Sequence, residues 1–200
     1  MTITPAWLRA RASAPALLKN TSGLAAVEFA MILPIMLVLF FGTVEMSNGV
    51  AVYRNVTLMA HTLSDLTSQS ISVGSTTDLP NFFAASTGVM TPYSAASISQ
   101  TITEIWVNPS GQARVQWSYG SAQLTPGTPF PNLPSNLAVP NSYVIFSQVG
   151  YLYQPAVGYV MPIAGVSLSD FAYTRPRQYP CVLYNPPMPI STPPPACPTL

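Results

Sequence analysis

Charged side chains are scarce in this chain of 200 residues: Asp, Glu, Lys and Arg together make up 6% of it, against about 25% in an average soluble protein. The formal net charge is +1, so no basic surface is available to attract the phosphates of nucleic acid. Hydrophobic residues reach 48%, which argues against intrinsic disorder. This balance argues against an ordinary cytosolic enzyme as well as a nucleic-acid-binding protein.

Residues that carry catalysis or bind metals are also few. The single histidine, His61, stands four residues before Asp65, and we expect the two to form an exposed pair on one helical turn. No GxSxG motif supplies a nucleophile, and no His and Cys residues have the spacing of a metal site. The sequence therefore predicts no enzyme, no cofactor, no metal site and no small-molecule substrate.

One long apolar run is present, from Leu24 to Val44, and it contains a single charge, Glu28, and a single proline, Pro34. About 20 apolar residues cross the hydrocarbon core as a helix, so we predict a transmembrane helix over residues 24–46. Pro34 should kink it, which membrane helices tolerate. A carboxylate costs roughly 2.5–3.5 kcal/mol at the bilayer centre and less near the interface, so Glu28 should have a partner or a function.

The flanks of this run predict its orientation. Arg9, Arg11 and Lys19 precede it with no acid among them, so the positive-inside rule places a basic leader, residues 1–23, in the cytoplasm and the C-terminal bulk in the periplasm. A cleaved secretory signal is the alternative. However, its apolar region is typically about 7–15 residues long, and the end of this run is a poor cleavage site. An uncleaved span is favoured.

The helical pattern continues over residues 47–72, which we predict to be amphipathic. Apolar residues follow one another there at spacings of four and three, which places them on one helix face. We expect this packing seam to contact the chain's own C-terminal domain first and other subunits second. Its members are Val52, Val56, Met59, Leu63 and Leu66.

Residues 73–175 predict a small α+β domain with an antiparallel sheet, because runs rich in β-branched and aromatic residues alternate with turn signals. We expect a hairpin of two strands, a third strand after a Pro-rich loop (residues 121–141), and a final short strand. A helical turn capped by Asp78 should lie at Leu79–Ser86. The predicted strands are Ile98–Val107, Ala113–Tyr119, Tyr143–Tyr153 and Leu168–Thr174.

Residues 176–200 are Pro-rich, and we expect them to wrap over the surface as a tail. Cys181 and Cys197 enclose a 15-residue loop there. In a periplasmic segment a disulfide is permitted, and it would contribute about 3 kcal/mol in the chain-entropy model. Free thiols are the alternative.

The aromatic residues of the domain have two interpretations. They form the core and faces of the sheet, or they form an exposed surface that binds a ligand, and the first is favoured. The residues are Trp106, Trp117, Tyr119, Tyr143, Tyr151, Tyr153 and Tyr159.

The run Gly23-Leu24-Ala25-Ala26-Val27-Glu28-Phe29 resembles the class III signal of type IV pilin-like proteins. Extended to Pro34, it resembles the TadE-like family of Tad (tight adherence, Flp) pilus systems. Phe41-Gly42 and Glu45 continue the resemblance, with fainter similarity at Tyr151–Pro155 and Arg175–Arg177. The family implies that a prepilin peptidase cuts between Gly23 and Leu24 and leaves the helix on the protein. Glu28 of one chain would then pair with the new amine of Leu24 on a neighbour.

The resemblance implies a minor pilin or pseudopilin, anchored in the bacterial inner membrane by one span. Its partners would be the peptidase, other pilin-like subunits and the pilus assembly platform, and its role would serve surface adhesion and biofilm formation. Two alternatives belong to other classes. One is a membrane-anchored envelope binding module with an aromatic ligand surface, and the other is a secreted protein whose signal peptide is removed.

Overall fold

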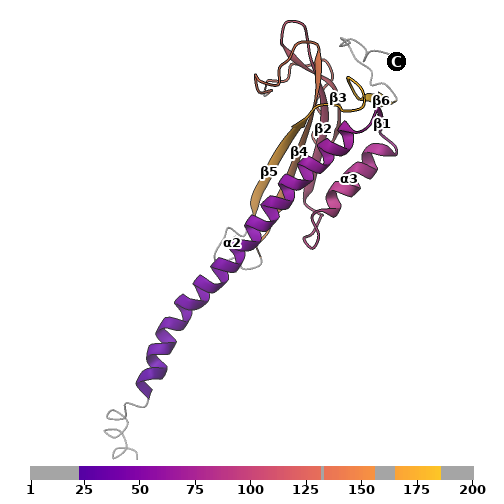
Figure 1. The fold of residues 1–200 in the computed structure, drawn as a ribbon. Helices are drawn as coiled ribbons and strands as arrows, with labels where there is room; N and C mark the ends of the chain where they lie inside the picture. The colour runs from indigo at the N-terminus through magenta and orange to yellow at the C-terminus, as the bar shows by residue number, and fades with distance from the viewer. Residues whose placement is uncertain (1–22, 132, 156–164, 186–200) are drawn as a thin grey trace, which may run out of the picture. The chain divides into compact units, whose positions relative to one another are not determined.

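The computed structural model describes residues 23–131, 133–155 and 165–185. The chain forms two compact units, Met1–Glu45 and Met46–Leu200, which are described in turn. The fold class is as predicted: a long apolar helix followed by a small α+β domain with an antiparallel sheet (Figure 1). The elements are α2 (Leu24–Ser68), β1 (Ser72–Gly74), α3 (Asp78–Gly88), β2 (Ile98–Val107), β3 (Ala113–Gly120), β4 (Ser142–Tyr153), β5 (Val166–Thr174) and β6 (Leu183–Asn185).

The first unit contains the N-terminal half of α2, which includes Pro34. Over its most apolar 18 residues the helix has a mean hydropathy of 2.5, and none of those residues is buried. The hydroxyl of Thr43 donates to the carbonyl oxygen of Leu39 over 2.8 Å, which satisfies a polar side chain within the helix itself. This half of α2 is therefore long and apolar enough to cross a membrane.

The second unit is built on a four-stranded antiparallel sheet with the strand order β3-β2-β4-β5. All four predicted strands are present, and β2 and β3 form the expected hairpin. A β-bulge interrupts that hairpin, because Glu104 pairs with Trp117 whereas Ile105 pairs with Val115, which leaves Gln116 as the extra residue. Such a bulge locally re-aims the side chains on either side of it.

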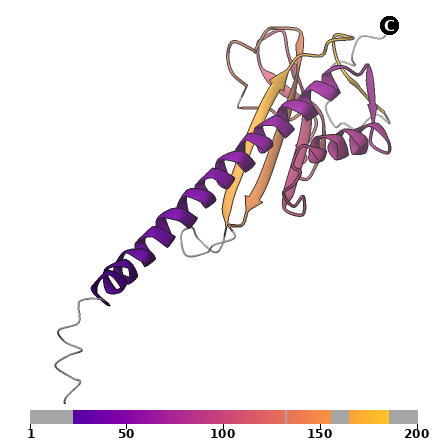
Figure 2. The ribbon, with the colours of Figure 1, turned by 60° about the horizontal axis from the view of Figure 1, so that its bottom comes forward.

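The C-terminal half of α2 and the short helix α3 cover the same face of this sheet (Figure 2). Alternation along the strands places Ile102 and Ile145 on that face, where both are fully buried. The opposite face carries a separate apolar cluster in which Ile105 and Phe146 pack against Phe130 from the Pro-rich segment. Helices therefore cover one side of the sheet, and residues 121–141 contribute to covering the other.

Two local predictions are wrong. Asp78 does not cap α3: the residue at the cap position is Thr77, which makes no side-chain capping bond, and the Asp78 carboxylate instead accepts the N–H of Gly74 over 2.8 Å. Residues 181–185 are also no surface tail, because β6 pairs in parallel with β1 and the preceding Cys181 and Val182 are buried. Residues 186–200 lie outside the described part of the chain.

Candidate functional site

The predicted cleavage bond lies at the start of α2. Gly23 immediately precedes the first helical residue, Leu24, and no atom lies within 4 Å of the position that a Cβ on Gly23 would occupy. Leu24 and Phe29 are each 59% exposed. Among the described residues, no side chain crowds this bond.

Glu28 lies on the exposed surface of the same helix, one turn after Leu24. Its neighbours three and four residues away, which share its face, include Leu24, Met31 and Ile32, all of them apolar and exposed. Among the described residues no hydrogen bond or ion pair to its carboxylate is present. An acid in such apolar surroundings would gain most from a cation supplied by another chain.

The predicted packing seam lies in the second unit and faces the sheet. Val52, Val56 and Met59 are fully buried in a cluster that includes Val149 and Tyr151 of β4. One turn later the seam enters a second cluster, in which Leu63 packs with Ile102, Trp117 and Ile145. Leu66, the last member, is only partly buried.

Polar contacts hold the same stretch of α2 against the sheet. The hydroxyl of Ser147 donates to the carbonyl oxygen of Ala60 over 2.6 Å. Thr57 donates to the Asp170 carboxylate over 2.5 Å, and Ser64 donates to Thr174 over 2.8 Å. Side chains of β4 and β5 therefore fix the position of the helix at several points along its length.

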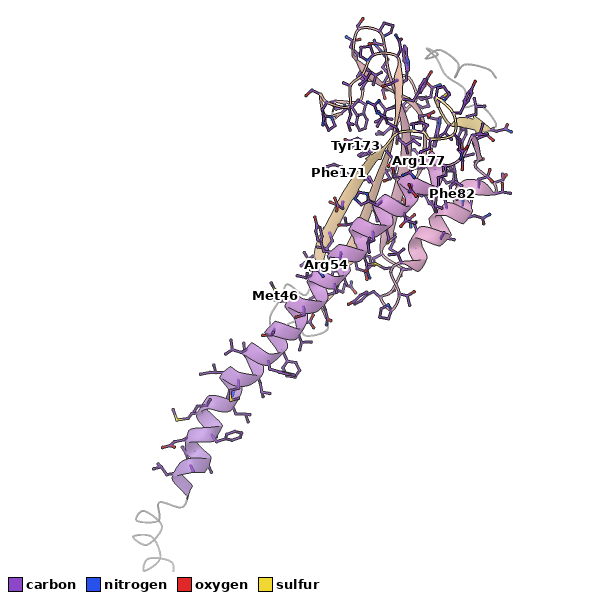
Figure 3. All side chains as sticks on the ribbon, viewed as in Figure 1. Met46, Arg54, Phe82, Phe171, Tyr173 and Arg177 are labelled. Atoms are coloured by element: carbon purple, nitrogen blue, oxygen red, sulfur yellow. The ribbon has the colours of Figure 1, made fainter. Side chains whose placement is uncertain are left out.

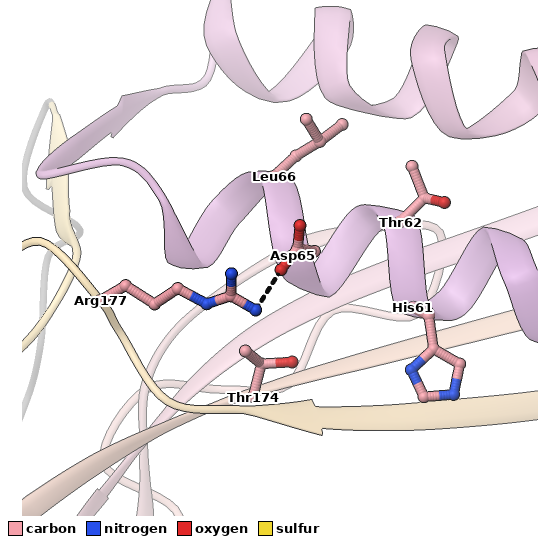
Figure 4. Close-up of a pocket in the computed structure, with 6 residues that line it drawn as sticks. All are labelled: His61, Thr62, Asp65, Leu66, Thr174 and Arg177. Atoms are coloured by element: carbon pink, nitrogen blue, oxygen red, sulfur yellow. Dashed lines mark ion pairs between the residues drawn. The ribbon is translucent and has the colours of Figure 1, made fainter.

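Asp65 makes its ion pair with a residue far along the chain, and not with His61 as the sequence predicts. Its carboxylate lies 2.5 Å from the guanidinium of Arg177 (Figure 4) and also accepts a hydrogen bond from Gln69 over 2.6 Å. His61 and Thr174 line the same shallow pocket. Both ion-paired side chains are well exposed, so the pair itself contributes little stability.

The centre of the sheet holds a buried carboxyl group. Glu104 of β2 is fully buried, and its two oxygens accept the backbone N–H of Val182 over 2.6 Å and the Nε1–H of Trp117 over 2.7 Å. Trp117 also donates to the carbonyl oxygen of Val182 over 2.8 Å. Burial raises the pKa of Glu104 to about 8, although both hydrogen bonds act in the opposite direction. Burial, and after it the charge of Glu104, raises the pKa of Tyr143.

Sequence reasoning missed this network, because acids are almost never fully buried and no motif distinguishes Glu104 from the other acids. One signal was available. Glu104 stands in the strand Thr103-Glu104-Ile105-Trp106, at the alternating position shared with Ile102, which identifies the inward face. Its partner Val182 comes from a segment interpreted as surface tail, so no local pattern could connect the two.

The aromatic residues of the domain are mostly interior. Trp117, Tyr143, Tyr151 and Tyr153 are all buried, whereas Trp106 and Tyr119 are half-buried and Tyr159 lies outside the described residues. The exposed aromatic side chain of the sheet is Phe171 on β5, at 56% exposure, beside Tyr173 (Figure 3). The four buried rings therefore belong to the core of the domain.

Cys181 is fully buried beside Tyr143, whereas Cys197 lies outside the described residues. The Cys181–Cys197 disulfide therefore stays a prediction. No group of three or more potential metal ligands occurs among the residues that the structure describes.

The comparison with protein families finds a match in the stretch where the sequence shows its resemblance. Residues 23–63 match the family model described as TadE-like protein. This TadE-like stretch contains the cleavage motif, the apolar half of α2 and most of the packing seam. No curated protein and no solved structure matches the chain.

The match covers 41 of the 200 residues, and over these residues the chain is similar to TadE-like proteins. In the part of the chain that the structure describes, one helix is long and apolar enough to cross a membrane, and it lies near the N-terminus.

Proposed function

We propose that this protein is a minor pilin or pseudopilin that supports the assembly of Tad (Flp) pili, and thereby surface adhesion and biofilm formation. The observation that carries the proposal is the open Gly23–Leu24 bond at the start of an exposed apolar helix within the TadE-like stretch. The basic leader faces the cytoplasm, and the domain that begins at Met46 faces the periplasm.

A prepilin peptidase cuts the Gly23–Leu24 bond on the cytoplasmic side, and the helix stays with the protein. This reaction creates an α-amine on Leu24, one helical turn before Glu28. The amine and the Glu28 carboxylate both lie in apolar surroundings, where opposite charges attract strongly. Each group therefore pairs with the opposite charge of a neighbouring subunit. The pairing sets the axial offset between adjacent helices during assembly.

The position of the mature N-terminus tests the proposal directly. Intact-mass measurement and N-terminal sequencing of the membrane-extracted protein should show a chain that starts at Leu24, and Gly23→Val should leave the leader attached. Ala26→Val, which changes a side chain on the other side of the bond, serves as the matched control and should be cut normally. A start at Met1 in the unmodified protein would contradict the proposal, and a start beyond Val44 would favour a secreted protein.

The role of Glu28 is tested separately from cleavage. Glu28→Gln keeps the size of the side chain but removes its charge, so the protein should be cut and inserted normally while pilus assembly and recovery with other pilin subunits are lost. Asp65→Asn, which removes an exposed acid outside the span, should leave assembly intact. Normal pili from the Glu28→Gln strain would remove the pairing from the proposal without affecting the cleavage step.

A further inference from the structure

An apolar groove opens on the second unit at the first residues of its helix. The helix side of the groove contributes Met46, Val50 and Tyr53, and the sheet side contributes Tyr153 at the end of β4 and Val166 and Leu168 at the start of β5. Its volume is about 220 Å³, and no charged residue lines it. Met46 and Val50 are 57% and 51% exposed, so the groove presents apolar side chains that the described residues leave uncovered.

Chain connectivity places this groove next to the predicted membrane span. Met46 follows Val44 by two residues, so their Cα atoms are at most about 7 Å apart. At 1.5 Å per residue, Val50 and Tyr53 lie about 6 and 10 Å further along the helix. The polar interface of a bilayer is roughly 5–7 Å thick on each side of the hydrocarbon core. Since the groove begins two residues after the apolar run in the sequence, we infer that its first residues meet lipid headgroups and the upper parts of acyl chains.

The chemistry around the groove suits that depth. Tyrosine is enriched at the membrane–water interface, where its ring lies against apolar groups and its hydroxyl meets water, and the groove contains Tyr53 and Tyr153. Arg54 lines a neighbouring hollow that shares Met46 and Val50 with the groove (Figure 3). Within the described part of the chain Arg54 has no ion-pair partner, and a guanidinium binds phosphate oxygens well.

We propose that this groove binds a glycerophospholipid of the periplasmic leaflet, with acyl carbons between Val50 and Leu168 and the phosphate on Arg54. The inference rests on the single-span anchoring of the proposed function. A second protein subunit is a poorer occupant, because a stable interface buries about 800 Å² per partner and this groove is a small hollow enclosed by two tyrosines.

Spin labelling in vesicles distinguishes the occupants. The full chain carrying Val50→Cys and a nitroxide label is reconstituted into vesicles of phosphatidylethanolamine and phosphatidylglycerol. Access of the label to oxygen, which concentrates in lipid, is compared with access to a water-soluble nickel complex. Leu58→Cys is the matched control, because Leu58 is 54% exposed on the same helix and lies about 12 Å beyond Val50.

The Val50 label should show an oxygen-to-nickel ratio severalfold above that of the Leu58 label, and Arg54→Gln should lower the Val50 ratio. Low access to both reagents at Val50 would show that protein fills the groove, either a second copy or residues 156–164, and would overturn the proposal. High access of the Val50 label to the nickel complex would show that water fills the groove and would also overturn the proposal. A label at Leu37→Cys tests the membrane anchoring itself. If the Leu37 label is not in lipid, the proposed function fails together with the inference. If the Leu37 label is in lipid and the Val50 label is not, only the inference fails.

Discussion

Glu104 is the residue whose environment departs furthest from what its type prefers. It occupies the middle of the central strand β2, and its two hydrogen-bond donors come from β3 and from the segment before β6. The bulge at Gln116 aligns Trp117 with Glu104, so the strand irregularity is part of what builds the site. Both oxygens of the carboxyl group accept a hydrogen bond, so the group joins a distant segment of the chain to the sheet.

The raised pKa of Glu104 predicts a pH dependence of stability. Its folded pKa is about 8 and its ordinary value is 4.5, so between these two values the folded state holds a proton that the unfolded state has lost. Stability due to this group is therefore complete below pH 4.5 and falls as pH rises toward 8, by at most about 1.4 kcal/mol per pH unit. Urea unfolding of the detergent-solubilised protein, followed by tryptophan fluorescence, should show this decrease.

Glu104→Gln provides the comparison for that prediction. It cannot ionise, so the fall in the free energy of unfolding between pH 5 and pH 8 should be reduced. Its amide oxygen still accepts the N–H of Val182, and Trp117 keeps the carbonyl oxygen of Val182 as an acceptor. An unchanged pH profile in this variant would show that the slope comes from other groups and that Glu104 is ionised in the folded protein.

At the scale of the element, α2 is one helix with two different surroundings. In its first half the apolar side chains are exposed all round, as in a membrane helix. In its second half a single apolar face is buried against β4 and β2, and polar contacts through Thr57 and Ser64 accompany it. The first half of α2 is therefore an exposed apolar segment, and the second half is a segment that packs on the sheet.

The packing seam predicts that substitutions at two leucines of α2 have very different effects on the free energy of unfolding. Leu63 is fully buried and Leu58 is 54% exposed. Leu63→Ala should lower the free energy of unfolding by about 2–5 kcal/mol, because it removes buried methyl groups and leaves a cavity. Leu58→Ala should change it by no more than about 0.5 kcal/mol. Chemical denaturation in one detergent measures both, and equal losses would contradict the predicted direction of the seam.

The long elements could be predicted from the sequence because their patterns are local. The 4-3-4-3 spacing from Val52 to Leu66 identified the helix, and alternation identified β3. By contrast, β1 and β6 have three residues each and become strands only by pairing across more than a hundred residues, so neither has a period of its own. Asp78 resembled a helix cap because the residue preference for capping is local. Its hydrogen bond to Gly74 forms only because the loop after β1 brings the two residues together.

At the scale of the whole molecule, the segment after β5 returns to the end of α2. The N–H of Arg177 donates to the carbonyl oxygen of Ser68, the last residue of the helix, over 2.8 Å. Further on, the N–H of Leu183 donates to Ile71 over 3.0 Å, and Val182 reaches Glu104. Residues 177–185 therefore satisfy backbone groups at the helix end and complete the buried network in the sheet. We therefore expect the domain to unfold as one cooperative unit.

Two truncations test that cooperativity. Ending the chain after Thr174 removes the partner of Glu104, the apolar burial of Val182 and the cap on Ser68. An unsatisfied buried group costs about 1–3 kcal/mol and a buried valine about 1.5–3 kcal/mol, a large fraction of a typical stability of 5–15 kcal/mol. Ending it after Asn185 keeps all these contacts. In reductant, so that no disulfide contributes, the longer fragment should match the full chain in urea midpoint while the shorter one unfolds at much lower urea. Equal midpoints would show that residues 177–185 merely lie on a domain that is complete without them.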